Sequence, residues 1–446
     1  MGAGRENLPY CGGSEPGMLS TQVEVVRFHC SRVGLLTNPH SACTLDSWTA
    51  QGRQDMQHFG ANLRRIRTAR GKSLDVVAGL AGISPSYLSR IERGERALDR
   101  RSLIAALARA LDVTPADIVG PAIPVTADTG VADDQVDAVR AALLAVSVGI
   151  PGGDVVSCDV LRSRAHILLN AQRDCDYRTV GESLPQLIRD VHASIQAGRD
   201  VRELLRLAVM LHVQGTAAWL GDIGGPSDLA WIATTLARDA AQRAEDPTSI
   251  AIASFGVGLG LLGEGAFELA SHVITAADPG TASPGGLHLS GMLALAYSLT
   301  AAAQGDTTSE TAALDHATDL TQHVDGDYGW FGFGAANVNL WRASAALERG
   351  DHATAASLTD RIEPDSLPNP TRRVAYYLAR ARACARLRHR RSDAVDALRA
   401  AERIAPARVH GSRVARGLVV ELSERARADV VGAELRGLAS RAGLDL

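Results

Sequence analysis

The stretch "ISPSYLSRIERGER", residues 83–96, indicates how the N-terminal part of this 446-residue chain folds. Ser84 is typical of a helix N-cap, and Pro85 of the first helical position, where the missing N–H costs nothing. Gly94 is typical of the residue that follows the end of a helix. The stretch therefore predicts one short helix with a defined start and a defined end.

The two faces of this short helix differ in character. Leu88 and Ile91 point to one side and predict a buried face. The residues expected on the outward face are Pro85, Ser86, Ser89, Arg90 and Arg93. A helix that lies in the major groove of DNA needs small residues where the bases come close. It also needs Arg where a guanine edge or a phosphate accepts two hydrogen bonds. The pattern predicts a helix that reads DNA.

The flanking sequence predicts four more helices. Apolar residues at helical spacing from Phe59 to Ile66 predict a helix that ends at Gly71. Ser73 is the expected N-cap of a second short helix, and Gly82 supplies backbone freedom in the turn that follows it. The remaining two helices are expected at residues 101–111 and 114–119.

These five elements, from residue 63 to residue 119, resemble the phage-repressor-like (XRE) helix-turn-helix family. The segment "SYLSRIERG" is the most specific part of the match. The resemblance implies that residues 56–120 form a helix-turn-helix domain whose partner is double-stranded operator DNA, read in the major groove. A helical bundle with a merely solvated basic face is the alternative.

The resemblance also implies roles for single residues. Glu92 should turn inward and pair with Arg67, which makes this ion pair structural. Many family members carry Gln at the position of Leu74, where the side chain supports a contact with a DNA phosphate. Leucine cannot do this, so main-chain N–H groups must bind the phosphate here. The implied DNA-binding residues are Lys72, Ser73, Ser84, Pro85, Ser86, Tyr87, Ser89, Arg90 and Arg93.

The charge of the chain is uneven. Residues 59–119 contain 11 Arg and Lys against 6 Asp and Glu, a net charge of +5, whereas the whole chain has a net charge of −4. Residues 1–58 contribute −1, so residues 120–446 carry −8. This balance argues against a protein that coats nucleic acid along its whole length. It favours a basic DNA reader attached to an acidic body with another role.

The rest of the chain divides into three parts. Residues 1–55 show neither helical nor strand periodicity, so we expect a disordered tail or a start codon placed too early, with Met56 as the true start. Residues 121–134 are rich in Gly and Pro and predict a linker. Residues 135–446 consist almost entirely of helix-forming sequence.

A loose repeat of roughly 40 residues runs through this C-terminal part. The clearest copies occupy residues 337–364 and 376–406, each with two helical segments, a polar turn and a terminal Pro. They resemble tetratricopeptide (TPR) repeats. The resemblance implies an all-α chain, with a five-helix helix-turn-helix domain followed by an α-solenoid of TPR-like antiparallel helix pairs. The concave face of such a solenoid usually binds a partner or dimerises.

Aromatic residues gather between residues 328 and 341, although the whole chain has only 18 of them. One interpretation is an effector pocket with aromatic walls and an amide that orients the ligand. Ordinary packing between repeats remains the alternative. The candidate ligand-binding residues are Tyr328, Trp330, Phe333, Asn337 and Trp341.

The sequence gives little support for an enzyme. Gly258, Gly260 and Gly263 form a G-x-G-x-x-G pattern, but the flanking segments are helical, whereas a dinucleotide fingerprint follows a strand. We expect these glycines to let two helices approach closely. The six cysteines show no C-x-x-C pair, so we expect no metal site, no cofactor and no disulfide framework. No apolar run approaches the ~20 residues that span a bilayer.

Together these patterns predict a cytoplasmic bacterial transcription regulator. We expect a homodimer that reads two half-sites, with a body that dimerises and senses a small molecule or a peptide. The alternative is a TPR-type protein–protein interaction scaffold whose helix-turn-helix module has no regulatory role.

Overall fold

The computed structural model describes residues 59–120, 133–324, 331–424 and 430–444. The expected tail at residues 1–55 and most of the expected linker lie outside the described residues. All described residues belong to one compact unit, Thr49–Leu446. We call residues 59–120 the head and residues 133–444 the body. Every regular element in the described ranges is helical, so the chain is all-α there.

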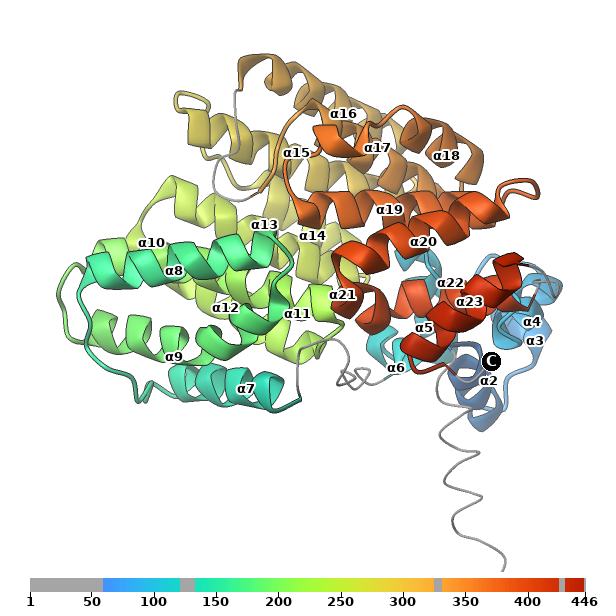
Figure 1. The fold of residues 1–446 in the computed structure, drawn as a ribbon, viewed down its shortest axis with the longest axis horizontal. Coiled ribbons are helices and arrows are strands. Elements are labelled where there is room, and N and C mark those ends of the chain that lie inside the picture. The colour runs from blue at the N-terminus through green and yellow to red at the C-terminus, as the bar shows by residue number, and fades with distance from the viewer. Residues whose placement is uncertain (1–58, 121–132, 325–330, 425–429, 445–446) are drawn as a thin grey trace, which may run out of the picture. The chain divides into compact units, whose positions relative to one another are not determined.

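Five helices form the head, and Figure 1 shows their arrangement. They are α2 (Phe59–Ala69), α3 (Leu74–Leu80), α4 (Pro85–Glu92), α5 (Arg101–Leu111) and α6 (Pro115–Val119). The head has a hydrophobic core of its own, separate from that of the body, which includes Leu63, Leu88, Ile91, Leu107 and Ile118. The head is therefore a distinct folding module within the unit.

Local signals fix the ends of the head helices. The hydroxyl of Ser73 accepts a hydrogen bond from the backbone of Val76, and Ser84 does the same for Tyr87. Each cap satisfies a backbone N–H that has no partner inside its helix. Gly94, with a φ of 76°, ends α4 in the left-handed region that favours glycine. These caps fix the start and the end of α4.

The body begins with six α-helices and one π-helical segment, η2. They are α7 (Asp133–Ser147), α8 (Cys158–Arg173), α9 (Tyr177–Gln196), α10 (Val201–Met210), η2 (Leu211–Ala217), α11 (Ala218–Ile223) and α12 (Ser227–Ala244). The second half continues as consecutive helices that pack in pairs. These are α13 (Pro247–Gly263) with α14 (Phe267–Thr275), α15 (Pro284–Gln304) with α16 (Thr307–Leu320), α17 (Ala335–Arg349) with α18 (His352–Asp360), and α19 (Pro370–Ala385) with α20 (Arg391–Ile404). The chain ends with α21 (Pro406–Gly411), α22 (Arg413–Ser423) and α23 (Val430–Arg441).

Small residues allow these pairs to pack closely. Ala355 and Ala394, on the second helices of two pairs, are fully buried. The three glycines of the G-x-G-x-x-G pattern lie inside α13, where a Cβ atom at Gly258 would overlap the side chain of Ile274 on α14. Gly258 and Gly260 thus lie at helix–helix contacts, Gly263 has no neighbour close to it among the described residues, and all three lie inside a helix rather than after a strand.

One described helix, α15, is long and apolar enough to cross a membrane by length and composition. However, 78% of its most apolar window is buried inside the protein, as expected for the central helix of a folded domain. The helix is therefore weak evidence for a membrane span.

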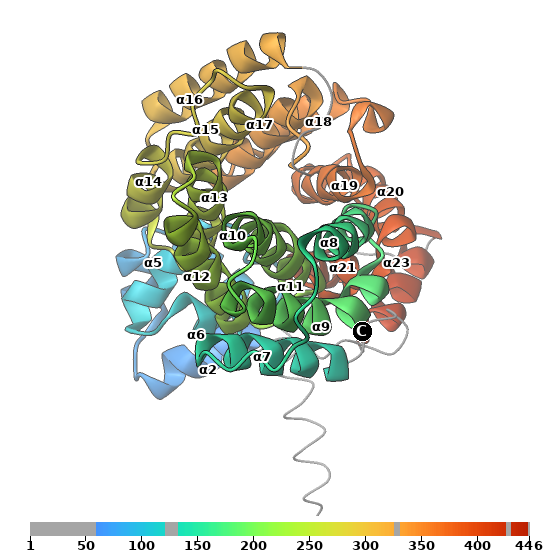
Figure 2. The same ribbon diagram turned by 90° about the vertical axis from the view of Figure 1, so that its left-hand side faces the viewer.

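The first and last parts of the body contact each other, so segments far apart in the sequence lie side by side (Figure 2). Helix α8 contacts α19, and α11 contacts α21. The backbones of Gly224 and Gly411 meet so closely that a Cβ atom on either would overlap the other segment. Arg408 Nε lies 3.1 Å from Asp222 Oδ1 across the same contact. The body closes on itself through this contact.

The head is held on the body by three buried carboxylates. Glu421 on α22 accepts a 2.9 Å hydrogen bond from the backbone N–H of Ala97 and pairs with Arg96. Glu348 on α17 accepts a 2.8 Å hydrogen bond from the backbone N–H of Ser102. The third carboxylate, Asp99 of the head, pairs with arginines of α19 and its C-terminal cap, namely Arg382 and Arg386. The loop after α4 and the start of α5 therefore form the docked side of the head.

Candidate nucleic-acid interface

The outward face of α4 is accessible in the docked head. Ser84, Pro85 and Ser86 are exposed, and the side chain of Arg90 is 37% exposed and that of Arg93 52% exposed. The predicted residues Tyr87 and Ser89 are half-buried. The opposite face of α4 is buried in the core of the head. The helix thus presents small and cationic side chains together on one accessible surface, which we call the α4 face.

A bidentate ion pair fixes α4 against α2. Arg67 Nε lies 2.6 Å from Glu92 Oε1, and Arg67 Nη2 donates a 2.9 Å hydrogen bond to Glu92 Oε2. The hydrogen bond to Glu92 raises the pKa of the Arg67 guanidinium above its ordinary value. Because both side chains are largely buried, Glu92 sets the position of α4 and takes no part in the accessible face.

Glu95 holds the two arginines of the α4 face in the free protein. Its carboxylate lies 2.6 Å from Arg93 Nε and 3.4 Å from Arg90 Nε. The hydrogen bond from Arg93 lowers the pKa of the Glu95 carboxyl below its ordinary value. Sequence reasoning did not include Glu95, although the spacing in "RIERGE" places it just after the helix end. The guanidinium groups must leave this carboxylate before they can contact bases or phosphates.

The structure places Lys72 differently from the implied phosphate contact. Its ammonium group donates a 2.6 Å hydrogen bond to the carbonyl of Ala110, near the C-terminal end of α5. Carbonyl groups at a helix C-terminus attract a cation, which explains this position. Ser73 remains exposed as the N-cap of α3, and Leu74 packs against the core of the head. Contact with a DNA phosphate at this place is therefore left to Ser73 and to the backbone N–H groups at the start of α3.

The three candidate effector residues that the structure describes, Phe333, Asn337 and Trp341, do not line one pocket together. Tyr328 and Trp330 lie outside the described residues. Phe333 is buried against His288, with ring centroids 5.9 Å apart. Asn337 is fully buried, and its nearest hydrogen-bond partner is the sulfur of Met292 at 3.8 Å. For Phe333 and Asn337, the pocket interpretation is therefore replaced by packing between helices.

Trp341 differs from these neighbours, because it lines a large cavity between the head and the body. The sequence offered no signal for this cavity, since its walls come from segments spread between residues 60 and 443. Within the described residues, no group of three or more His, Cys, Asp or Glu side chains is arranged to hold a metal ion.

The head fold and the accessible α4 face together define a helix-turn-helix DNA-binding domain. A family model described as a helix-turn-helix domain matches residues 58–118, which cover α2 to α6 almost completely. The match supports DNA as a partner of this chain. Neither the curated proteins nor the solved structures that were searched contain a match to the chain.

Proposed function

We propose that this protein is a cytoplasmic, sequence-specific transcription regulator of the XRE type with a TPR-like body. The helix-turn-helix domain supplies DNA binding, and the consecutive helix pairs of the body support the TPR-like assignment. The net charge of +5 on residues 59–119 and of −8 on residues 120–446 directs DNA toward the head.

The observation that carries this proposal is the accessibility of the α4 face while the head is docked. The body contacts the loop after α4 and the start of α5, through Glu421 and Glu348. The outward residues of α4 stay free of the body, with Pro85 and Ser86 exposed. A recognition helix must reach base edges in the major groove, and this arrangement leaves it able to do so.

Dimerisation is part of the proposal. Helix-turn-helix domains commonly bind as dimers to two half-sites about 34 Å apart or a multiple of that distance. Large apolar side chains that stay exposed in a soluble protein often mark an interaction surface. Four such side chains lie within twelve residues at the end of α7 and in the loop that follows, namely Leu144, Val148, Ile150 and Val155. This segment is the surface that we propose for contact with a second copy.

Selection of genomic fragments by the purified full-length protein tests the proposal. We expect enrichment of a short palindromic sequence, and binding to it should weaken steeply with salt because each phosphate contact releases counterions. Sedimentation velocity in the same buffer should give a dimer. Salt-insensitive or undetectable binding to every fragment would favour the alternative, an interaction scaffold with a non-regulatory head.

A further inference from the structure

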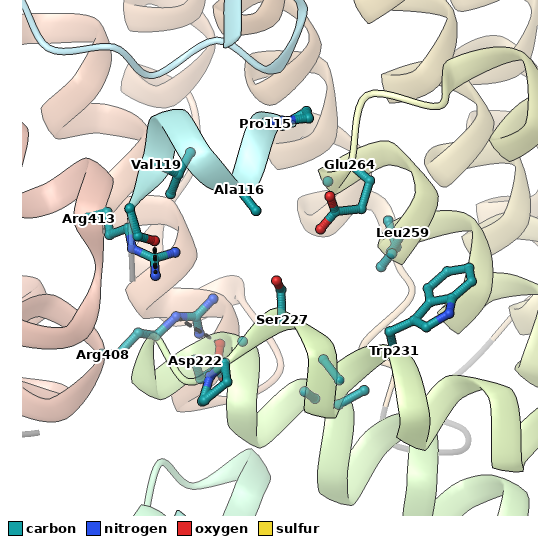
Figure 3. Close-up of a pocket in the computed structure, with 18 of the residues that line it drawn as sticks. Pro115, Ala116, Val119, Asp222, Ser227, Trp231, Leu259, Glu264, Arg408 and Arg413 are labelled. Atoms are coloured by element: carbon teal, nitrogen blue, oxygen red, sulfur yellow. Dashed lines mark hydrogen bonds and ion pairs between the residues drawn. The ribbon is translucent and has the colours of Figure 1, made fainter. Parts of the chain in front are cut away.

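A cavity of about 1860 Å³ lies between the head and the body. In Figure 3, Pro115, Ala116 and Val119 of α6 face Asp222 and Ser227 of the body across this space. Ligand sites of drug-sized molecules measure about 300–1,000 Å³. The cavity is thus large enough for a small molecule together with ordered water.

The charge of the cavity wall is opposite to that of the body around it. Seven arginines line the cavity against four carboxylates, although residues 120–446 as a whole carry −8. The arginines are Arg65, Arg96, Arg173, Arg372, Arg408, Arg413 and Arg416, and the carboxylates are Asp117, Asp222, Asp228 and Glu264. An excess of positive charge in a cavity favours an anionic occupant.

Two of these arginines, Arg413 and Arg416, have no acidic partner within the described residues. They stand three positions apart on α22, and therefore on one face of that helix. Arg413 Nη2 donates a 3.2 Å hydrogen bond to the carbonyl of Gly120, while its buried Nε has no partner in the described structure. Arg416 is 7% exposed, and its acceptors among the described residues are the carbonyls of His410 and Ala442.

Two buried arginines without an acidic partner in the described residues are unfavourable when the cavity contains no ligand. Burial lowers the pKa of both Arg413 and Arg416 below the ordinary value, because the charged form is poorly solvated there. Most buried arginines in proteins are paired with a carboxylate. A second polar atom on this wall, besides Arg413 Nε, also lacks a partner, since the buried Oε1 of Gln172 accepts no hydrogen bond in the described structure. All three side chains line the cavity.

The remaining wall of the cavity is aromatic and apolar. Trp231 on α12 and Trp341 on α17 line it, together with Phe255 and Leu259 of α13. Trp231 is 43% exposed, which is unusual for so large an apolar side chain. A flat apolar ligand would cover this ring and remove it from water.

We propose that this cavity binds a small organic anion with a flat apolar body, whose charged group is held by Arg413 and Arg416. Trp231 and Trp341 contact the apolar part, and Gln172 accepts a hydrogen bond from the ligand. The inference rests on the proposed function, because it names the chemical class of the effector that the regulator senses.

Binding at this place would couple the ligand to the position of the head. The carbonyl held by Arg413 belongs to Gly120, at the end of the head, and α6 forms one wall of the cavity. A ligand that contacts both sides stabilises the docked arrangement by its difference in affinity between docked and undocked states. The docked state is therefore the one that the ligand favours.

Fluorescence titration of the full-length protein with 8-anilinonaphthalene-1-sulfonate tests the site. This probe is a flat aromatic anion, and N-phenyl-1-naphthylamine is its neutral counterpart. We expect saturable binding of one anionic probe per chain. Arg413→Gln and Arg416→Gln should each weaken binding of the anionic probe at least tenfold and leave binding of the neutral probe unchanged. Arg238→Gln, which removes an exposed arginine of α12, is the matched control and should behave as the wild type.

Trp231→Ala tests whether the probes bind in the cavity, because it should weaken the binding of both. Equal weakening of both probes by the arginine variants, unchanged affinity in Trp231→Ala, or no saturable binding would overturn the proposal. Should Arg416→Gln lose its helical circular dichroism signal, Arg413→Gln decides alone, since its side chain is only half-buried. No DNA is present in this assay, so a failure of DNA binding leaves its result unaffected.

Discussion

At the scale of single residues, the α4 face is organised around a competition between Glu95 and DNA for two guanidinium groups. In the free protein the carboxylate holds Arg93 closely and Arg90 more loosely. Exposed ion pairs of this kind contribute little to stability. Their effect on binding can be larger, because DNA must displace the carboxylate and then tolerate its negative charge nearby.

Arg90→Ala should weaken specific DNA binding by about 1–3 kcal/mol and relax the base preference at one position of the site. The reason is that a guanidinium group makes two hydrogen bonds to a guanine edge, which alanine cannot replace. Affinity measured against a panel of single-base operator variants checks both effects. Arg109→Ala, at an exposed position of α5, is the control. Full and selective affinity in Arg90→Ala would contradict the assignment.

Glu95→Gln should strengthen binding to the operator several-fold. The substitution keeps the size of the side chain, but it releases Arg90 and Arg93 and removes a negative charge that faces the phosphates. Electrophoretic mobility shift titrations at two salt concentrations give the comparison. Unchanged or weaker binding would show that Glu95 positions the arginines for DNA instead of competing with it.

Glu92→Ala should destabilise the head by about 3 kcal/mol, because it leaves the Arg67 guanidinium buried without its counter-charge. Thermal unfolding followed by circular dichroism provides the measurement. If the melting temperature equals that of the wild type, the ion pair between Glu92 and Arg67 does not stabilise the head.

At the scale of helices, much of the head could be predicted from sequence, because short-range chemistry fixes its elements. Ser84, Pro85 and Gly94 determine where α4 starts and ends within a dozen residues. In contrast, the aromatic cluster near Phe333 was ambiguous, since a buried ring in a core and one in a ligand pocket have the same local sequence. Only the packing of Phe333 against His288 decides between these two.

A histidine pair that the sequence did not reveal joins the π-helical segment η2 to α9. His192 Nε2 on α9 lies 2.9 Å from His212 Nε2, and His212 is fully buried. Burial lowers the pKa of His192 to about 4, and burial together with His192 lowers the pKa of His212 well below its ordinary value. Both rings are therefore neutral in the folded protein at neutral pH.

The stability of the body should consequently fall as the pH drops from 6.5 toward 4. In this range the unfolded chain binds a proton at His192 and the folded chain does not, so acid favours unfolding. The loss attributable to His192 is on the order of 2 kcal/mol between pH 7 and pH 5. Urea denaturation of the wild type and of His192→Gln at both pH values measures it. A variant with the same pH dependence as the wild type would refute this account.

At the scale of the whole molecule, the contacts that matter most join residues far apart in the sequence. Glu421 and the backbone of Ala97 are 324 residues apart, and Glu348 and Ser102 are 246 apart. No periodicity or motif in the sequence indicates such pairs, because each carboxylate has the sequence context of an ordinary residue of its own helix. The docking of the head and the cavity beneath it therefore could not be predicted from the sequence.

Glu348→Gln combined with Glu421→Gln should separate the unfolding of the head from that of the body. Loss of both buried carboxylates leaves Arg96 and Arg101 without their counter-charges at the interface, and Arg386 must then share Asp99 with Arg382. Differential scanning calorimetry should show a new transition at lower temperature. Glu424→Gln, an exposed position beyond the end of α22, is the matched control and should keep the profile of the wild type.

The close meeting of Gly224 and Gly411 bears on how such a chain can change during evolution. An open array of helix pairs tolerates duplication or loss of one pair, since each pair contacts only its neighbours. Here an extra pair would push the two glycines apart and break the Arg408–Asp222 ion pair. Descendants of this gene should thus vary in the length of their loops while the number of helix pairs stays constant.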